Sequence, residues 1–369
     1  MDARLYWVAF NHVKGIGAVR MRALLDHFGN LERAWYAPPE ALRTAGLSPR
    51  LVEAVLDARK RLHLDEIEDM LAQQHIRVIT WEDEDYPFLL KNIDQPPPVL
   101  YLRGTMLPSD QMAVAVVGTR QVSAYGRRVT EHLASVLAQR GVTVVSGLAR
   151  GVDALAHEAA LNAGGRTLAV LGNGVDVIYP PEHQHLATRI EGQGALLSDY
   201  PPGTPPEATN FPPRNRIISG LAIATVVVEA GEKSGALITA TFAAEQGREV
   251  FAVPGNITSP ASRGTNRLIA NGARPLLHPE DVLEVLDLAE VQHQQAVRAL
   301  LPGNEVEATL LKIMGDQVLT VDEMCFLSGL SAEKVLASLA MMELKGLVRN
   351  LGGASFTTLR EDTAFYVGG

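Results

Sequence analysis

The most restrictive feature of this sequence is a repeated alternation, from Ala113 to Val253, of short apolar runs with longer amphipathic stretches. The apolar runs are AVAVV, VTVVS, TLAVLG, ALLSD, AIATVVVE and EVFAV. Runs without alternating polar positions are typical of strands buried on both faces of a parallel sheet that helices cover. We therefore predict an α/β fold with a Rossmann-like parallel-sheet core, in which ligands bind outside the carboxyl ends of the strands.

The sequence on either side of this core predicts two further domains. Residues 1–75 place apolar residues at three- and four-residue spacing, which is typical of a small helical domain. Its predicted helices are LYWVAFNHV, VRMRALLDHF, PEALRTA, PRLVEAVLDARKRL and DEIEDMLAQQ. We assign residues 76–288, which begin with short extended pieces, to an extended Rossmann-like domain, and the Gln-rich residues 289–303 to a linker. Residues 304–369 have the pattern of three helices and a Gly-tipped hairpin, similar to a winged helix-turn-helix.

Two interpretations fit the triplet Gly15-Ile16-Gly17 between the first two predicted helices. It resembles the turn of a helix-hairpin-helix, whose exposed amides can bind a phosphate, and Lys14, Arg20 and Arg22 lie close by. The alternative is an ordinary turn in a small SAM-like helical bundle. The net acidic composition of residues 1–102 favours the ordinary turn.

Charge is distributed unevenly along the chain. Its 369 residues carry 33 Lys and Arg against 42 Asp and Glu, a net charge of −9, which argues against a generally basic protein that coats nucleic acid. The net charge is −3 over residues 1–102, +2 over residues 103–274 and −8 over residues 275–369. Fourteen of the 15 basic residues in the middle block are arginine, whose planar guanidinium suits phosphate oxygens. This distribution predicts a local anion site within an acidic protein.

The single cysteine and the N-terminal sequence indicate a cellular compartment. Cys325 alone cannot form an internal disulfide or a CxxC metal site, which favours a reducing environment. The N-terminal sequence MDARLYWVAFNHVKG lacks the apolar segment of a signal peptide. The longest uncharged apolar stretch, Ile217 to Val228, is about half of the roughly 20 residues that a membrane helix needs. We expect a cytoplasmic protein with no membrane partner.

The turn after the first strand run has the features of a phosphate site. It spans Gly118 to Gly126, with the sequence GTRQVSAYG, and leads into a helix predicted to begin at Arg127. Glycine permits close approach of the backbone, the helix N-terminus offers free amides, and Arg120 adds a positive charge. The dinucleotide fingerprint GxGxxG is absent, and no acidic residue ends the second run, so a NAD or FAD enzyme is not indicated.

The turn after the second strand run carries a possible acid/base pair. Ser146 and Gly147 lead into a helix on which Asp153 and His157 lie four residues apart, on one face. One interpretation is general acid/base chemistry. The favoured alternative is a carboxylate that stabilises the helix start and a histidine with its hydrogen bonds satisfied.

Two further strand ends carry glycine-containing turns. The third run is followed by GNGVDVIYPPEH, which predicts a turn in which Tyr179 could offer a stacking face. The fifth run is followed by Lys233, Ser234 and Gly235 before a helix near Ala236, which predicts a second anion site. The Walker spacing GxxxxGK[ST] is absent, so ATP hydrolysis is not indicated.

The segment NFPPRNRIISGL combines an aromatic residue with arginines at the start of a helix. Phe211 beside Arg214, Asn215 and Arg216 suits single-stranded nucleic acid, whose bases stack on aromatic rings and whose phosphates pair with cations. Equally, Phe211 could fill the core and Arg216 could pair with a carboxylate of the sheet.

Motifs for catalysis or metal binding are missing from the sequence. There is no GxSxG elbow, no Cys-His arrangement, no HExxH and no cluster of metal ligands. We predict no catalytic residue, no metal site and no cofactor.

Four segments together resemble the DprA/Smf family of DNA-processing proteins. They are GTRQVSAYG, SGLARGVDALAH, NFPPRNRIISGL and SGALITATFAAEQGREVFAVPGN, in this order, between Ala113 and about Ala273. The resemblance implies a bacterial recombination mediator that is not an enzyme and that binds and protects incoming single-stranded DNA during natural transformation. It also implies a homodimer formed through the Rossmann-like domain, and the loading of RecA onto DNA held by single-strand binding protein.

The resemblance also assigns roles to single residues. The family's DNA-contacting arginine falls on Arg120, and the aromatic before the RNR run falls on Phe211. Many members carry extra basic residues on either side of that aromatic, where this chain has Ala208 and Pro213, so we expect weaker binding at this face. The full set of predicted DNA-binding residues is Gly118, Thr119, Arg120, Ser123, Gly126, Ser146, Gly147, Phe211, Arg214, Asn215, Arg216, Lys233, Ser234 and Gly235.

Two alternatives share the same turns. Related Rossmann-like phosphoribohydrolases act on nucleoside monophosphates with a glutamate shortly after a GGxGT turn, whereas SGALITA here has no glutamate until Glu245. A nucleotide sensor without catalysis is the other alternative. Separately, residues 304–369 hold five basic and nine acidic groups, which predicts that the winged helix contacts protein rather than DNA.

Overall fold

The computed structural model describes residues 2–286, 305–315, 317–344 and 347–358. The chain divides into two compact units, residues 1–286 and 287–369. The linker predicted at 289–303 lies outside the described residues. The boundary predicted at residue 75 also stays a prediction.

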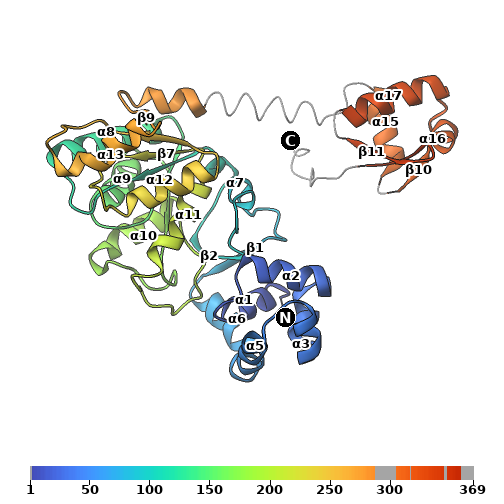
Figure 1. The fold of residues 1–369 in the computed structure, drawn as a ribbon, viewed down its shortest axis with the longest axis horizontal. Coiled ribbons are helices and arrows are strands. Elements are labelled where there is room, and N and C mark those ends of the chain that lie inside the picture. The colour runs from blue at the N-terminus through green and yellow to red at the C-terminus, as the bar shows by residue number, and fades with distance from the viewer. Residues whose placement is uncertain (1, 287–304, 316, 345–346, 359–369) are drawn as a thin grey trace. The chain divides into compact units, whose positions relative to one another are not determined.

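Among the described residues of the first unit, nine strands form one sheet in the order β1-β2-β6-β5-β4-β3-β7-β8-β9 (Figure 1). The strands from β6 to β9 in that order are parallel, whereas β2 is antiparallel to both β6 and β1. The strands are β1 (Arg77–Thr80), β2 (Val99–Gly104), β3 (Ala113–Val117), β4 (Thr143–Ser146), β5 (Thr167–Val170), β6 (Ala195–Ser198), β7 (Ala224–Val227), β8 (Glu249–Ala252) and β9 (Arg274–Pro275).

The predicted Rossmann-like sheet is confirmed, and burial explains its sequence pattern. Every residue of β3, β4, β5, β6 and β7 is buried. Along β3, Val114 and Val116 contact the apolar cluster on one face, and Ala115 and Val117 contact the cluster on the other. Because neither face meets water, the strands need no polar positions.

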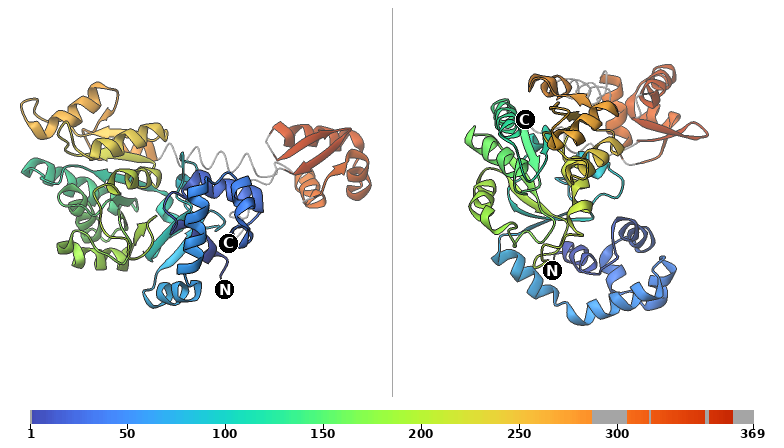
Figure 2. Two further views of the ribbon diagram at one scale, coloured as in Figure 1. Left: turned by 60° about the horizontal axis from the view of Figure 1, so that its bottom comes forward. Right: turned by 60° about the vertical axis from the view of Figure 1, so that its left-hand side comes forward.

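Helices cover both faces of the sheet (Figure 2). Residues of α8 and α9 lie in the cluster that contains Val114, and residues of α11 and α12 lie in the cluster that contains Ala115. The helices of this region are α8 (Ala124–Gln139), α9 (Val152–Asn162), α10 (Gln184–Gln193), α11 (Phe211–Gly220), α12 (Ala236–Glu245) and α13 (Arg263–Ala270), with 3-10 turns at Pro108–Gln111, Pro181–His183 and Pro260–Ser262.

The start predicted for α8 at Arg127 is wrong by three residues, since the helix begins at Ala124. The cause is a side-chain cap: Ser123 Oγ accepts a hydrogen bond from the amide of Gly126 at 3.1 Å. The turn that leads to the helix is therefore shorter, and Gly126 lies in the first helical turn.

The N-terminal helices share an apolar cluster with the sheet, and β1 and β2 lie between them and the parallel strands (Figure 1). Two helices were not predicted: Leu31–Tyr36, and the short Phe88–Lys91 within the segment expected to be extended. Asn30 caps the first by accepting a hydrogen bond from the amide of Arg33 at 2.9 Å. These helices are α1 (Arg4–Asn11), α2 (Ala18–Phe28), α3 (Leu31–Tyr36), α4 (Pro39–Thr44), α5 (Pro49–Arg61), α6 (Leu64–Gln73) and the short α7 (Phe88–Lys91).

The second unit has the predicted winged-helix arrangement in its described residues. Three strands pair in the order β10-β12-β11 beside three helices. Thr320 and Glu323 form a reciprocal capping box at the start of the middle helix. The elements are α15 (Glu305–Met314), β10 (Leu319–Thr320), α16 (Val321–Ser328), α17 (Ala332–Leu344), β11 (Val348–Gly352) and β12 (Ser355–Thr358).

The length and hydropathy of the helices bear on whether the chain could cross a membrane. In the described parts of the chain, no single helix is long and apolar enough to cross a bilayer. One sharply bent pair of helices, Val321–Ser328 with Ala332–Glu343, is long and apolar enough when taken together, by length and composition only.

Candidate nucleic-acid interface

The loops at the carboxyl ends of β3 and β7 are tied together through Glu229. The amide of Thr119 donates to the carbonyl oxygen of Glu229 at 2.7 Å. The Glu229 carboxylate accepts from the amide of Ser123 at 2.9 Å and from its hydroxyl at 2.5 Å. A buried carboxylate thus fixes the predicted phosphate turn, and the Ser123 hydroxyl is engaged in that contact.

Phe211, the first residue of α11, lies against the loop that follows β5. A Cβ atom at Gly172 would lie 2.8 Å from Phe211 Cδ1, so only glycine leaves room for the ring in this position. The ring centroid of Tyr179 lies 5.8 Å from that of Phe211, with 35° between the planes. Phe211 is half-buried and Tyr179 is 37% exposed, so this aromatic pair is accessible from solvent.

Arg120 completes the accessible surface at this edge. Its Cζ atom lies 5.9 Å from the centroid of the Phe211 ring, within cation–π range. Arg120 is exposed and forms no ion pair with any described residue. We refer to Arg120, Tyr179 and Phe211 as the aromatic patch.

Arg214, a predicted DNA contact, is instead buried beneath the aromatic patch. Arg214 is only 4% exposed. Its Nη1 atom donates hydrogen bonds to the carbonyl oxygen of Gly147, at 3.0 Å, and to that of Val170. Burial lowers the pKa of Arg214 to about 10, which leaves the guanidinium charged at neutral pH. Its Cζ atom lies 5.8 Å from the Phe211 centroid. Arg214 therefore links the ends of β4 and β5 and supports the ring from below.

Of the two roles considered for Arg216, contact with nucleic acid or pairing with a carboxylate, the structure has the pairing. Nη2 lies 2.9 Å from Asp199 Oδ2, in an ion pair whose side chains are 19% and 16% exposed. Asp199 directly follows β6, so this is the predicted pairing with a carboxylate at the sheet. The neighbouring Asn215 donates from Nδ2 to the carbonyl oxygen of Gly235 at 3.3 Å, joining α11 to the loop before α12.

Asp153 and His157 hold structure rather than form an acid/base pair. The Asp153 carboxylate accepts from the amides of Gly147 at 3.2 Å and Ala149 at 3.3 Å, and burial raises its pKa. His157 is fully buried, and Nδ1 lies 2.6 Å from Thr167 Oγ1. Burial lowers the pKa of His157 to about 3, so the imidazole is neutral at physiological pH.

The other predicted residues divide by exposure. Ser146 is fully buried and donates to the carbonyl oxygen of Val116 at 2.7 Å; Gly126 and Gly147 are buried as well. These residues shape the turns but offer no surface. Lys233 and Gly235 are exposed, and Gly118, Thr119 and Ser234 are partly exposed. Lys233 forms no ion pair with a described residue, so its ammonium group is available to an anion.

Tyr179, for which the sequence suggested a turn with a possible stacking face, lies beside the Phe211 ring. The contributor to this edge that the sequence analysis missed is Glu229. Glu229 ends the apolar run AIATVVVE, and an acidic residue directly after a buried strand was the signal for its role. In the described part of the chain, no three His, Cys, Asp or Glu side chains gather as a metal site.

Comparison with known proteins decides the family. Residues 77–287 match the model of DNA recombination-mediator protein A, which is more than half of the chain. The chain belongs to this family. Residues 294–354 match the DprA winged helix domain, which confirms the winged helix.

Relatives of known name agree with this family. Protein Smf of Synechocystis sp. is 36% identical, with 95% of this chain and 98% of the relative covered. Protein Smf of Escherichia coli is 41% identical over 77% of this chain and 78% of the relative. DNA processing protein DprA of Bacillus subtilis is 45% identical over 60% of this chain and 75% of the relative.

Solved structures extend the likeness to the fold. DNA processing protein A of Streptococcus pneumoniae is 32% identical with a TM-score of 0.67, over 77% of this chain and 98% of that one. DNA processing protein A of Helicobacter pylori is 30% identical with a TM-score of 0.52, over 58% of this chain and 97% of that one. The Helicobacter protein is described as having a single-stranded DNA binding mode.

Proposed function

We propose that this family member binds single-stranded DNA at the carboxyl edge of its parallel sheet. The observation that carries the proposal is the aromatic patch, in which accessible rings lie beside an unpaired guanidinium. The single-stranded DNA binding mode described for the Helicobacter relative supports the same ligand.

The chemistry of the patch suits a strand without a fixed sequence. Bases stack on the faces of Phe211 and Tyr179, at roughly 1–3 kcal/mol per stacked base. Arg120 and Lys233 pair with phosphates. Since every base has a π-face and every nucleotide a phosphate, these contacts do not select a sequence. Buried Arg214 supports the Phe211 ring.

Within this proposal the protein is a binding protein and not an enzyme. Three carboxylates at this edge each hold another part of the protein: Glu229 holds Ser123, Asp199 holds Arg216, and Asp153 holds the turn after β4. The glutamate of the hydrolase alternative would be Glu245, which ends α12, about 14 Å along the helix axis from its start at Ala236. Incubation with nucleoside monophosphates, with released base as the readout, should give no product.

The finer role follows from the family and is part of the proposal. We infer that the protein acts as a homodimer that protects incoming DNA and loads RecA onto strands held by single-strand binding protein during transformation. The expected result is faster RecA filament assembly on such strands when the protein is added. Unchanged assembly would remove RecA loading while leaving DNA binding intact.

The test of the binding site is Arg120→Ala. Loss of the guanidinium removes one phosphate contact, so we expect roughly tenfold weaker binding and a salt slope shallower by about 0.7 on single strands. The measurement is fluorescence anisotropy of a labelled oligonucleotide at several salt concentrations.

Arg140→Ala is the matched control for this test. Arg140 is exposed and caps the far end of α8, about 24 Å along the helix from the predicted turn. It should bind as the wild type does. Equal affinity of the two variants would remove Arg120 from the site.

A further inference from the structure

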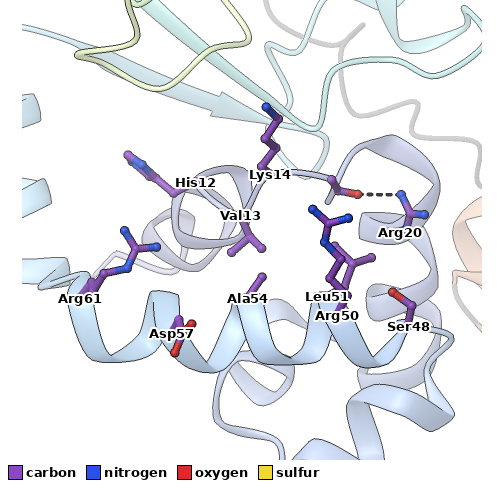
Figure 3. Close-up of a pocket in the computed structure, with 11 residues that line it drawn as sticks. His12, Val13, Lys14, Arg20, Ser48, Arg50, Leu51, Ala54, Asp57 and Arg61 are labelled. Carbon is purple, nitrogen blue, oxygen red and sulfur yellow. Dashed lines mark hydrogen bonds between the residues drawn. The ribbon is translucent and has the colours of Figure 1, made fainter.

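A cationic groove, distinct from the aromatic patch, lies in the N-terminal helices, between the turn after α1 and the face of α5 (Figure 3). Its volume is about 590 Å³. It is independent of the aromatic patch, with which it shares no residue. The lining residues are His12, Val13, Lys14, Gly15, Arg20, Ser48, Arg50, Leu51, Ala54, Asp57 and Arg61.

The positive charge in this groove is concentrated and mostly unpaired. Lys14, Arg50 and Arg61 are exposed and form no ion pair with any described residue. Arg20 donates to the carbonyl oxygen of Gly15 at 2.7 Å, which leaves its charge uncompensated. One carboxylate, Asp57, lines the groove against these four cations, although residues 1–102 are net acidic.

The geometry of α5 spaces these charges along one line. Arg50 and Arg61 lie three helical turns apart, on the same face and about 16 Å from each other along the axis. Ala54 and Asp57 occupy the same stripe between them. Lys14 lines the opposite side of the groove, and its side chain points away from α5 (Figure 3). A row of cations along a groove fits a linear polyanion better than a small one.

The polar groups of the groove are also free to bind. Ser48 is the N-cap residue of α5, yet its hydroxyl makes no capping hydrogen bond. Gly15 has φ of +101°, a conformation that favours glycine and lets a ligand approach the backbone closely.

We infer that this groove binds the sugar-phosphate backbone of DNA, separately from the aromatic patch. The lining contains no Phe, Tyr or Trp side chain, so it lacks the large stacking faces of the aromatic patch. Its floor is formed by short apolar residues, Val13, Leu51 and Ala54. Arginine-rich walls without a stacking face recognise phosphates and not bases, so the groove accepts duplex as well as single strands. The DNA recombination-mediator family makes DNA the polyanion that this chain meets.

The test is the double variant Lys14→Glu/Arg50→Glu in the full chain. Removing two phosphate contacts should weaken duplex binding roughly tenfold and reduce the salt slope by about 2. Binding of the separated strand should weaken by a similar factor. Anisotropy with a labelled duplex and with its separated strand, at several salt concentrations, measures both.

Arg33→Glu/Arg43→Glu is the matched control, since it makes the same change of charge on the same helical region outside the groove. If the groove variant binds both DNA forms as tightly as this control does, the inference fails. A groove that binds an acidic protein segment instead of DNA would give this same result. Far-UV circular dichroism checks folding, and Lys14→Gln/Arg50→Gln replaces the reversal if that variant does not fold.

Arg120→Ala separates this inference from the proposed function. Removing the Arg120 side chain from the aromatic patch should weaken binding of the single strand more than binding of the duplex. Removing the cations of the groove should weaken binding of both DNA forms alike. Normal binding by Arg120→Ala together with weak binding by the groove variant would remove Arg120 from the proposed site and support the groove.

Discussion

At the scale of single residues, two arginines of one edge differ in role because they differ in burial. Arg120 and Arg214 lie 5.9 and 5.8 Å from the Phe211 ring, and the sequence predicted both as DNA contacts. Arg120 is exposed, while Arg214 is 4% exposed and donates to backbone carbonyls. Neighbouring sequence does not tell these environments apart, because Arg214 is buried by strands far from it in the chain.

Buried His157 makes the stability of the protein depend on pH. Thr167 Oγ1 donates to the carbonyl oxygen of Val144 at 2.7 Å, so it accepts from Nδ1–H of His157, and Nε2 carries no proton. The pKa of His157 is about 3 in the folded state and 6.5 when unperturbed. Below pH 6.5 the unfolded chain therefore binds a proton that the folded chain does not.

The stability contributed by neutral His157 is complete above pH 6.5 and is lost as the pH falls toward about 3. Between pH 6.5 and 5 the loss should be about 2 kcal/mol. Urea unfolding of the wild type and of His157→Gln at several pH values measures it, as the difference between the two profiles. Parallel profiles would contradict this prediction.

At the scale of elements, the position of α11 against the end of β5 decides where the aromatic patch lies. The helix begins at Phe211, and the ring occupies the space that a side chain at Gly172 would fill. The contact joins two elements about 40 positions apart in the sequence, so it is a property of the packed sheet and not of either segment.

Gly172→Ala should disturb this contact. The added Cβ atom would lie 2.8 Å from Phe211 Cδ1, so the ring must move, at a cost of about 1–3 kcal/mol of stability. Single-strand affinity should fall with it. Gly192→Ala, where no atom lies within 4 Å of the new Cβ, is the control: it should leave affinity unchanged and raise stability by at most about 1 kcal/mol, because alanine favours the helix α10. Thermal melting and anisotropy measure the two effects, and the same result for both variants would refute the contact.

At the scale of the whole molecule, the distribution of charge limits how DNA can bind. The net charge of −9 excludes a basic coat, and the +2 block of residues 103–274 contains the carboxyl edge of the sheet. Residues 275–369 carry −8, which is unfavourable for groove binding by the winged helix. Binding is therefore expected at focused sites in the first unit.

Deletion of residues 304–369 should accordingly leave single-strand affinity within about twofold of the wild type, since few phosphate contacts are lost. Anisotropy of the full chain and of the shortened chain compares them. The first unit has its own apolar clusters, so it should keep its melting transition. A tenfold loss of affinity would place part of the DNA site in the winged helix.

The sequence alone determined the strands from β3 to β8 and their order along the chain. Strand runs from AVAVV to EVFAV lie where the sheet has β3 to β8, because an apolar run reports local burial directly. It also located the carboxyl edge and Arg120 and Phe211 upon it. The start of α8 was misplaced, since the Ser123 cap competes with the preference of the following residues.

Only the tertiary structure decided which side chains remain free. Glu229 holds Ser123 across 106 positions, and Arg214 bonds to Gly147 across 67. Arg216 is neutralised by Asp199, while Lys14 and Arg50 line a groove and form no ion pair with any described residue. The physical reason is that burial patterns are local in sequence, whereas hydrogen bonds and ion pairs depend on distances that exist only after the chain has packed.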